Sequence, residues 1–238
     1  METSTHPAKG ELKIELMSPN GAKNSTIFIL GSTGSGKSEL AANLIKQRPR
    51  FVIFDTKLEY RAEYFGKDVA VCEHSTKLLN LLNDCINKII FKVGLNDAEF
   101  EKAMGYVYQF QQANAKTEQN PNGKLEVPLT VFADEVNRFA ETNNWGDNFQ
   151  DVIQRGRSFR IEKIFCASWF GDIPTWVRDT LSEVYAFNHK DQQGVDRLGQ
   201  FGFYADDVMN LPPYHVAYVG KGEYKILELV ATNKNNKR

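Results

Sequence analysis

Short apolar runs alternate with helical patterns along most of the chain. Runs rich in β-branched and aromatic residues predict buried strands at 25–30, 51–54, 69–72, 89–93, 129–133, 164–168 and 184–187. Apolar residues at helical spacing predict helices between them, at 39–47, 78–89, 97–112, 148–158 and 174–182. This order is typical of an α/β protein with a mainly parallel sheet covered on both faces, and such sheets bind ligands at the carboxyl ends of their strands.

The two ends of the chain have a different pattern. Residues 12–17 alternate and predict an edge strand, whereas 215–219 and 224–230, around Lys221-Gly222, predict a β-hairpin. The polar stretch 111–128 contains the turn signal Asn120-Pro121-Asn122-Gly123 and predicts a mobile loop. We expect a single domain over 1–238, with a core at about 25–200, a hairpin extension at 201–230 and a frayed tail at 231–238.

Composition narrows the class of protein. Of the 238 residues, 42% are hydrophobic and 25% are charged, as in folded globular proteins. Lysine and arginine number 29 against 30 acidic residues, and the net charge of −1 excludes a generally basic surface but not a local basic patch. The 3 cysteines and 4 histidines show no metal-ligand spacing, which argues against a structural metal site. The cysteines are instead expected to be buried thiols of a protein in a reducing compartment.

A phosphate-binding motif follows the first long apolar strand. Residues 31–38 match G-x-x-x-x-G-K-[ST] at every fixed position, between a predicted strand and a predicted helix. The amides of such a loop bind phosphate oxygens, its lysine reaches the β and γ phosphates, and its serine hydroxyl ligates magnesium. The motif predicts ATP and Mg²⁺ as cofactors, no other metal, and a binding segment made of Gly31, Ser32, Thr33, Gly34, Ser35, Gly36, Lys37, Ser38 and Glu39, with Lys37 catalytic and Ser38 on the metal.

Acidic residues follow two further strands. Asp134 and Glu135 end the strand at 129–133 in the Walker B pattern, which predicts that Asp134 holds magnesium and Glu135 polarises the attacking water. After the strand at 51–54, the segment 55–60 reads Asp-Thr-Lys-Leu-Glu-Tyr. We expect Asp55 near the nucleotide and Glu59 near the same water as Glu135; solvated loop charges are the alternative. A glutamate after the aspartate favours hydrolysis by water.

In order along the chain, these motifs resemble the FtsK–HerA superfamily of DNA-pumping ATPases. The resemblance covers about residues 25–200 and includes the phosphate loop, Asp55-x-Lys57-x-Glu59-Tyr60, Asp134-Glu135, Arg155-Gly156-Arg157 and Gly171-Asp172-Ile173-Pro174. It implies a P-loop NTPase fold of the RecA/ASCE type, a three-layer sandwich with the hairpin at its end. The bare core is similar, within that superfamily, to the genome-packaging ATPases of tailless icosahedral viruses with internal membranes.

The resemblance also implies the partners and the location of the protein. It implies an ATP-hydrolysing motor that forms a homo-oligomeric ring, with six subunits expected, and moves double-stranded DNA into a preformed capsid. A capsid vertex or a portal-like membrane protein would be a further partner. The expected location is the cytoplasm of the host cell, or the packaging vertex of the virion. A cellular FtsK- or HerA-like DNA-translocating or DNA-transfer ATPase is the alternative function.

Arginines beyond the acid pair complete the site that the resemblance implies. Arg157, and after it Arg155, would stabilise charge on the γ-phosphate bound by a neighbouring subunit; a solvated helix end is the alternative. The family usually places a glutamine that senses the γ-phosphate after Ala167-Ser168, but Trp169 stands there. Ser168, or a glutamine elsewhere, would have to replace it.

The contacts with DNA are predicted from charge and aromaticity. Lys116 and Lys124 in the polar loop, and Arg138 after the acid pair, are candidates for binding DNA phosphates. Trp169 and Phe170 are candidates for stacking on bases, or for packing in the core or an interface.

Three other functions fit parts of the sequence. A GTPase would use the segment 188–191, Asn-His-Lys-Asp, to bind guanine, but its lysine stands one place too late. A small-molecule or nucleoside kinase would need a base for the substrate hydroxyl and an arginine-rich lid. A nucleotide-gated assembly protein would keep Lys37 but would have no need of Glu135.

Overall fold

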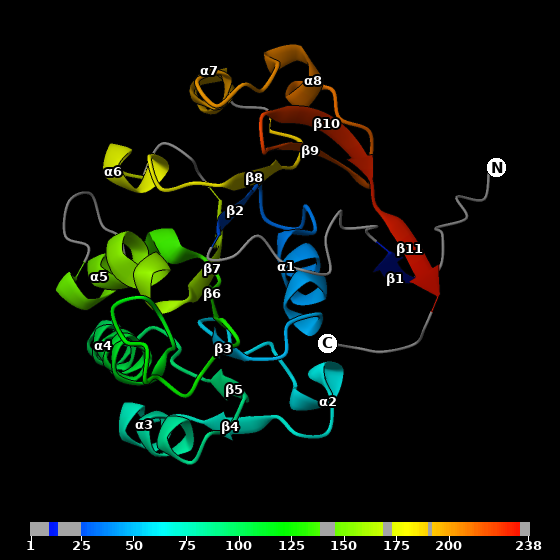
Figure 1. Cartoon of the computed structure of the whole chain (residues 1–238). Coiled ribbons are helices and arrows are strands. Elements are labelled where there is room, and N and C mark those ends of the chain that lie inside the picture. Colours follow the sequence, from blue (N-terminus) through cyan, green and yellow to red (C-terminus); the bar gives the residue numbers. More distant parts are fainter. Residues whose placement is uncertain (1–9, 14–24, 139–145, 169–172, 190–191, 234–238) are drawn as a thin grey trace.

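A computed structural model describes residues 10–13, 25–138, 146–168, 173–189 and 192–233. Within them, nine strands form one sheet in the order β10-β9-β8-β2-β7-β6-β3-β5-β4 (Figure 1). In chain order these are β2 (Thr26–Leu30), β3 (Phe51–Phe54), β4 (Ala70–Cys72), β5 (Lys88–Phe91), β6 (Leu129–Ala133), β7 (Ile161–Ala167), β8 (Glu183–Ala186), β9 (His215–Gly220) and β10 (Glu223–Glu228). A separate ladder pairs β1 (Gly10–Lys13) with β11 (Val230–Asn233).

The sheet is parallel from β8 to β4, and only the β8–β9–β10 end is antiparallel. β7 lies between β2 and β6, and β6 lies between β7 and β3. The residues after β2, β3 and β6 therefore share one edge of the sheet, the carboxyl edge. This arrangement confirms the predicted fold class, a mainly parallel α/β sheet with a terminal antiparallel hairpin.

Helices cover both faces of the sheet (Figure 1). The α1 (Lys37–Lys46) and α2 (Ala62–Phe65) helices lie on one face, and α3 (Ser75–Asn83), α4 (Asp97–Asn114) and α5 (Asp147–Arg155) lie on the other. Along β2, Ile27 and Ile29 pack with α1, whereas Phe28 and Leu30 belong to the cluster on the α4 face. Burial of both faces explains why the strands read as continuous apolar runs.

The remaining elements are short. They are α6 (Thr175–Arg178), α7 (Gln192–Gly199), α8 (Ala205–Met209) and two 3₁₀ turns, η1 (Val136–Arg138) and η2 (Gly156–Phe159). Among the described residues, no helix has the length and apolar character needed to cross a membrane.

Several short elements differ from the predictions. The sequence pattern does not predict α2, α7, α8 or β11, and the helix predicted at 174–182 is confined to Thr175–Arg178. The tail predicted to fray from residue 231 continues through Asn233 as β11, because it pairs with β1. The predicted mobile loop is fastened: Ala115 bridges Leu125, and the Arg160 guanidinium donates to the carbonyls of Lys116 and Glu126.

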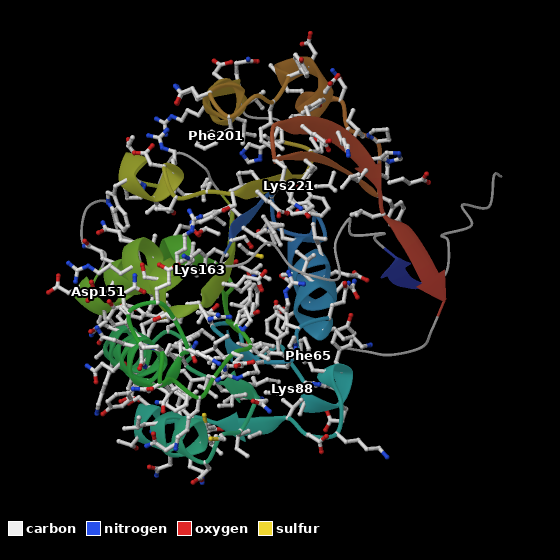
Figure 2. All side chains as sticks on the ribbon, in the orientation of Figure 1. Phe65, Lys88, Asp151, Lys163, Phe201 and Lys221 are labelled. Atoms are coloured by element: carbon white, nitrogen blue, oxygen red, sulfur yellow. The ribbon has the colours of Figure 1, made fainter. Side chains whose placement is uncertain are left out.

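One lysine of the sheet is buried. Lys163, on β7, lies between the sheet and α5 (Figure 2), where its ammonium donates to the Ile153 carbonyl at 3.3 Å. Burial lowers the pKa of Lys163 to about 8. The hydrogen bond of Lys163 links β7 to α5, but removing its ammonium from water costs free energy.

A buried carboxylate, that of Glu162, ties α1 to the sheet at the amino-terminal edge of the strands. It accepts two hydrogen bonds of 2.7 Å from the Arg48 guanidinium and one of 2.6 Å from the Thr130 hydroxyl. The Ser25 hydroxyl donates to it at 3.3 Å. Arg48 follows α1, Thr130 lies on β6 and Ser25 precedes β2. The cluster therefore holds the end of α1 against the sheet and helps to fix the position of the helix.

We expect Glu162→Ala to lower the free energy of unfolding by about 3–5 kcal/mol, because it leaves the Arg48 charge buried without a partner. Urea denaturation measures this loss. The double variant Arg48→Met, Glu162→Leu is the control, since it removes both charges and should lose less than the single variant. Equal losses in the two variants would show that the ion pair is not the cause.

Candidate functional site

The phosphate loop is a sharp turn between β2 and α1. Gly31 leaves the strand with φ of 153°, and a Cβ added to it would lie 2.7 Å from the Cβ of Phe187. Gly36, directly before α1, has φ of 104°, a left-handed conformation that side chains disfavour. Both positions therefore require glycine, and the turn directs the loop toward the N-terminus of α1, as the sequence predicts.

Lys37, the first residue of α1, folds back over the loop. Its ammonium donates to the carbonyls of Gly31 at 2.6 Å and Ser32 at 2.9 Å, and the residue is 5% exposed. Burial lowers the pKa of Lys37, and the negative charge of Asp134 opposes this shift. Nearby, the Ser35 hydroxyl is buried without a hydrogen-bond partner among the described residues. A buried hydroxyl without a partner and a lysine ammonium in an amide-rich turn fit the phosphates of a nucleotide.

Asp134 occupies the carboxyl end of β6 and is fully buried. Its Oδ2 accepts a 2.9 Å hydrogen bond from the Ser38 hydroxyl and a long one of 3.4 Å from the Tyr60 hydroxyl. Its Oδ1 accepts from the Glu135 amide at 2.9 Å. Hydroxyl and carboxylate oxygens are the ligands that Mg²⁺ prefers, so Ser38 and Asp134 are suitable residues to hold it.

The protein alone does not supply a complete metal site. The described residues contain no group of three or more histidine, cysteine, aspartate or glutamate side chains that would hold an ion. Magnesium in P-loop sites usually completes its shell with water and phosphate oxygens. The donor set therefore fits a metal that arrives with a nucleotide.

Glu135 is held by Lys57, a residue of the 55–60 motif for which the sequence predicts no role. The Lys57 ammonium lies 2.8 Å from Glu135 Oε1 and 3.7 Å from Asp134 Oδ2. Partial burial acts to lower the pKa of Lys57, but the hydrogen bond to Glu135 and the charge of Asp134 raise it overall. Glu135 itself has φ of 47°, so its backbone is in the left-handed region. The predicted water-polarising carboxylate is thus fixed on both sides, by its backbone and by Lys57.

The segment after β3 is shaped around Asp55. This carboxylate is fully buried and accepts hydrogen bonds of 3.0 Å from the amides of Glu59 and Tyr60. Burial raises the pKa of Asp55, and the two amides oppose the shift. Asp55 therefore folds the turn that presents Lys57 and Tyr60 to the acid pair. The Glu59 side chain is exposed and makes no hydrogen bond or ion pair with described residues, so its role beside Glu135 stays a prediction.

The predicted arginines lie at the opposite edge of the sheet. Arg155 ends α5 and forms an ion pair of 3.1 Å with Asp151, and Arg157, in η2, is exposed. Both arginines precede the first residue of β7, whereas the phosphate loop follows the last residue of β2. Because β2 and β7 are parallel neighbours, these two positions lie at opposite edges of the sheet. The structure does not bring the arginines together with Lys37 in one chain. Trp169 and Phe170 lie outside the described residues, as does the side chain of Arg138.

The candidate DNA lysines are also at the amino-terminal edge. Lys116 forms a 2.7 Å ion pair with Glu126, and Lys124 is exposed in the same loop before β6. On the guanine-binding alternative, the Asn188 amide donates to the carbonyls of Met209 and Leu211, each at 3.1 Å. These contacts give Asn188 a structural role in holding α8, which argues against a GTPase.

Comparisons with known proteins agree with this geometry. A family model described as the central domain of helicase HerA matches residues 11–161, while no curated protein sequence is significantly similar. Genome packaging NTPase B204 of Sulfolobus turreted icosahedral virus 2 has a TM-score of 0.68 at 14% identity, covering 90% of this chain and 100% of its own. VirB4 of Thermoanaerobacter pseudethanolicus has 0.63 at 10% identity, covering 98% of both chains. The pCW3 conjugation coupling protein TcpA has 0.54 at 13% identity, covering 88% of this chain and 61% of its own.

We expect Lys57→Met to lower kcat for nucleotide hydrolysis by about 10- to 100-fold, a part of what a positioned general base contributes. Loss of the ion pair frees the Glu135 carboxylate to leave its position, whereas KM for the nucleotide should change less, because Lys57 does not belong to the phosphate loop. Lys57→Arg, which keeps the charge, should retain more activity. Steady-state kinetics measures both constants.

A double-mutant cycle tests whether Lys57 acts through Glu135. In a Glu135→Gln background, single-turnover measurements should show little further loss from Lys57→Met, because the partner carboxylate is already gone. An equal loss in both backgrounds would contradict this role.

Proposed function

The chain belongs to the HerA central-domain family of the FtsK–HerA superfamily, and from this membership we propose that it is an ATPase that translocates double-stranded DNA. The observation that carries the proposal is the 2.9 Å contact between the Ser38 hydroxyl and the Asp134 carboxylate. It joins the phosphate loop to the acid pair, as hydrolysis at a P-loop site requires.

Each polar residue of the site has a defined task in this proposal. The loop amides and Lys37 bind the β and γ phosphates, and Ser38 and Asp134 would hold Mg²⁺, which neutralises phosphate charge when bound. Glu135 accepts a proton from the attacking water, and Lys57 keeps its carboxylate oriented. Mg²⁺ dependence follows from the donor set of Ser38 and Asp134.

The specific work that we propose is packaging of a viral double-stranded DNA genome into a preformed capsid by a homo-oligomeric ring. Support comes from the fold shared with B204, a viral genome packaging NTPase, over the full length of that protein. A capsid vertex or portal-like membrane protein would anchor the ring, in the host cytoplasm or on the virion. DNA transfer between cells is the second candidate, because a conjugation coupling protein also shares the fold.

We expect ATP hydrolysis by the assembled protein to rise when double-stranded DNA is added, and the stimulation to fall as salt rises. Each phosphate contact contributes a slope of roughly −0.9 to a plot of log affinity against log salt. Turnover assays with and without DNA, at low and moderate salt, measure this. Lys37→Ala is the control and should abolish turnover in both conditions, because the phosphates lose their cation.

Equal turnover with and without DNA in assembled wild-type protein would contradict translocation. A nucleotide-gated assembly protein would then be the better proposal.

The described part of the site contains no arginine in contact with the phosphate loop or Asp134. No arginine among the described residues forms a hydrogen bond or an ion pair with Lys37, Ser38 or Asp134. Charge on the γ-phosphate therefore needs a further cation, and we assign this role to Arg157, with Arg155 as the second choice, of a neighbouring subunit.

We expect Arg157→Ala to lower turnover by about 10³–10⁵-fold, the usual effect of removing an arginine finger. Mixing this variant with Lys37→Ala should restore part of the activity, since some interfaces then pair an intact loop with an intact arginine. Sizing of labelled subunits verifies that mixed assemblies form. If they form without regaining activity, Arg157 does not act on a neighbour.

A further inference from the structure

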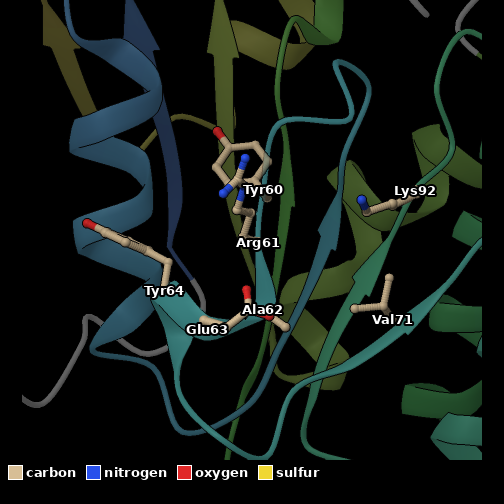
Figure 3. Close-up of a pocket in the computed structure, with 7 residues that line it drawn as sticks. All are labelled: Tyr60, Arg61, Ala62, Glu63, Tyr64, Val71 and Lys92. Atoms are coloured by element: carbon tan, nitrogen blue, oxygen red, sulfur yellow. The ribbon is translucent and has the colours of Figure 1, made fainter. Parts of the chain in front are cut away.

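A cavity of about 470 Å³ opens at the carboxyl edge of the sheet, on the β3–β5–β4 side of the nucleotide site (Figure 3). Its volume is within the range of pockets that hold ligands, on the order of 300–1,000 Å³. The chain after β3 forms one wall, and β4 with the residue after β5 forms the other. The lining residues are Tyr60, Arg61, Ala62, Glu63, Tyr64, Val71 and Lys92.

The alternation of side chains along β4 and β5 determines which of their residues face the cavity. Ile90 of β5 packs in the cluster on the α1 face, and Val71 of β4 is its paired neighbour. Lys92, two residues after Ile90, returns to the same face. Val71 is 45% exposed, so this end of the face is open.

The inner wall is rigid. The Tyr64 hydroxyl donates to Asn43 on α1 at 3.0 Å, and the Lys46 ammonium lies 4.8 Å from the centre of the Tyr64 ring. Tyr60 is 3% exposed and packs against Phe132. Phe65 of α2 also packs against Phe51 of β3, with the ring centres 5.5 Å apart. The short helix α2 is therefore held to both α1 and the sheet, and the cavity beside it has a preformed shape.

Two cations, Arg61 and Lys92, line this space. Arg61 is exposed and Lys92 is half-buried, and neither side chain forms a hydrogen bond or an ion pair with described residues. The charge of Lys92 does act on the buried Asp55 carboxylate, where it opposes the rise in the pKa of Asp55 that burial causes. In Figure 3 the Lys92 ammonium points across the cavity toward Arg61. Glu63 contributes the one carboxylate among the lining residues, so the lining carries a net positive charge. A guanidinium and an ammonium that line one cavity are suitable groups to bind phosphate.

Tyr60 belongs to both the cavity and the nucleotide site. Its ring lines the cavity, its amide donates to Asp55, and its hydroxyl donates to the magnesium-binding carboxylate of Asp134. Arg61 is the next residue in the chain. A ligand that moves Arg61 therefore acts on a segment whose other end contacts Asp134.

We propose that this cavity binds a backbone phosphate of the translocated DNA through Arg61 and Lys92, and that Tyr60 transmits its occupancy to Asp134. The proposal rests on the proposed DNA-translocating function and gives that function a contact site. A backbone phosphate is the common group of all DNA sequences, so the site would bind without sequence preference.

The test uses the assembled protein, Mg²⁺-ATP and a short duplex DNA. Arg61→Gln combined with Lys92→Gln should raise the DNA concentration for half-maximal stimulation of hydrolysis by about tenfold or more. It should also reduce the salt slope by roughly two, about one for each phosphate-binding cation. The matched control is Lys77→Gln with Arg197→Gln, exposed cations on α3 and α7 that should leave the DNA response unchanged.

The outcomes separate the site from the function. If wild-type protein is not stimulated by DNA, the proposed function and this site both fail. If wild-type and the double variant respond equally, the site is overturned and the function stands. A rise in KM for ATP, or competition by inorganic phosphate, without a changed DNA response would assign the cations to a free anion. An altered sizing profile alone would assign them to a subunit contact. Either result would overturn the proposal.

The transmission step has its own variant. Tyr60→Phe keeps the ring and removes the hydroxyl that donates to Asp134. We expect normal DNA affinity but a smaller ratio of stimulated to unstimulated turnover, because binding and hydrolysis are no longer joined. An unchanged ratio would show that Tyr60 does not transmit occupancy.

Discussion

The hydrogen bond between Ser38 and Asp134 is the constraint on which the site depends. The two residues follow strands that are not neighbours, because β7 separates β2 from β6, which places the strand axes roughly 9–10 Å apart. Ser38 closes this distance from the first turn of α1, directly after the phosphate loop. The position of α1 therefore decides whether Ser38 and Asp134 meet. That position is fixed at the other end of the helix, where Arg48 binds the buried Glu162.

Charge balance is the second constraint. The site contains two cations, Lys37 and Lys57, and two anions, Asp134 and Glu135. All four side chains are buried or largely buried. A buried charge without a partner costs several kcal/mol, so these four side chains hold one another in place. A nucleotide with its metal adds charges of both signs to this group. In the proposed function each side chain would then have a competing partner, and Lys37 would exchange its carbonyl contacts for phosphate.

The sequence predicts the two halves of the site but not what joins them. The phosphate loop and Asp134-Glu135 are recognisable because their chemistry depends on contiguous residues after strands. The position of Lys57 depends on Asp55 binding the amides of Glu59 and Tyr60 and on the left-handed turn at Leu58, which tertiary contacts stabilise. Likewise β11 forms because β1 pairs with it from the other end of the chain. Short elements such as α2 carry too few residues for a periodic signal, so their existence depends on packing.

The two edges of the sheet divide the functions of the chain. The amino-terminal edge carries Arg155 and Arg157 together with Lys116 and Lys124, and the carboxyl edge carries the nucleotide site. A closed ring needs two different surfaces that meet head to tail. If the arginines reach a neighbour's nucleotide, the edge that bears them faces that neighbour, and the lysines beside them are drawn into the same contact. DNA then requires cations elsewhere. Arg61 and Lys92 would meet this requirement, since their cavity shares Tyr60 with the proposed hydrolytic site.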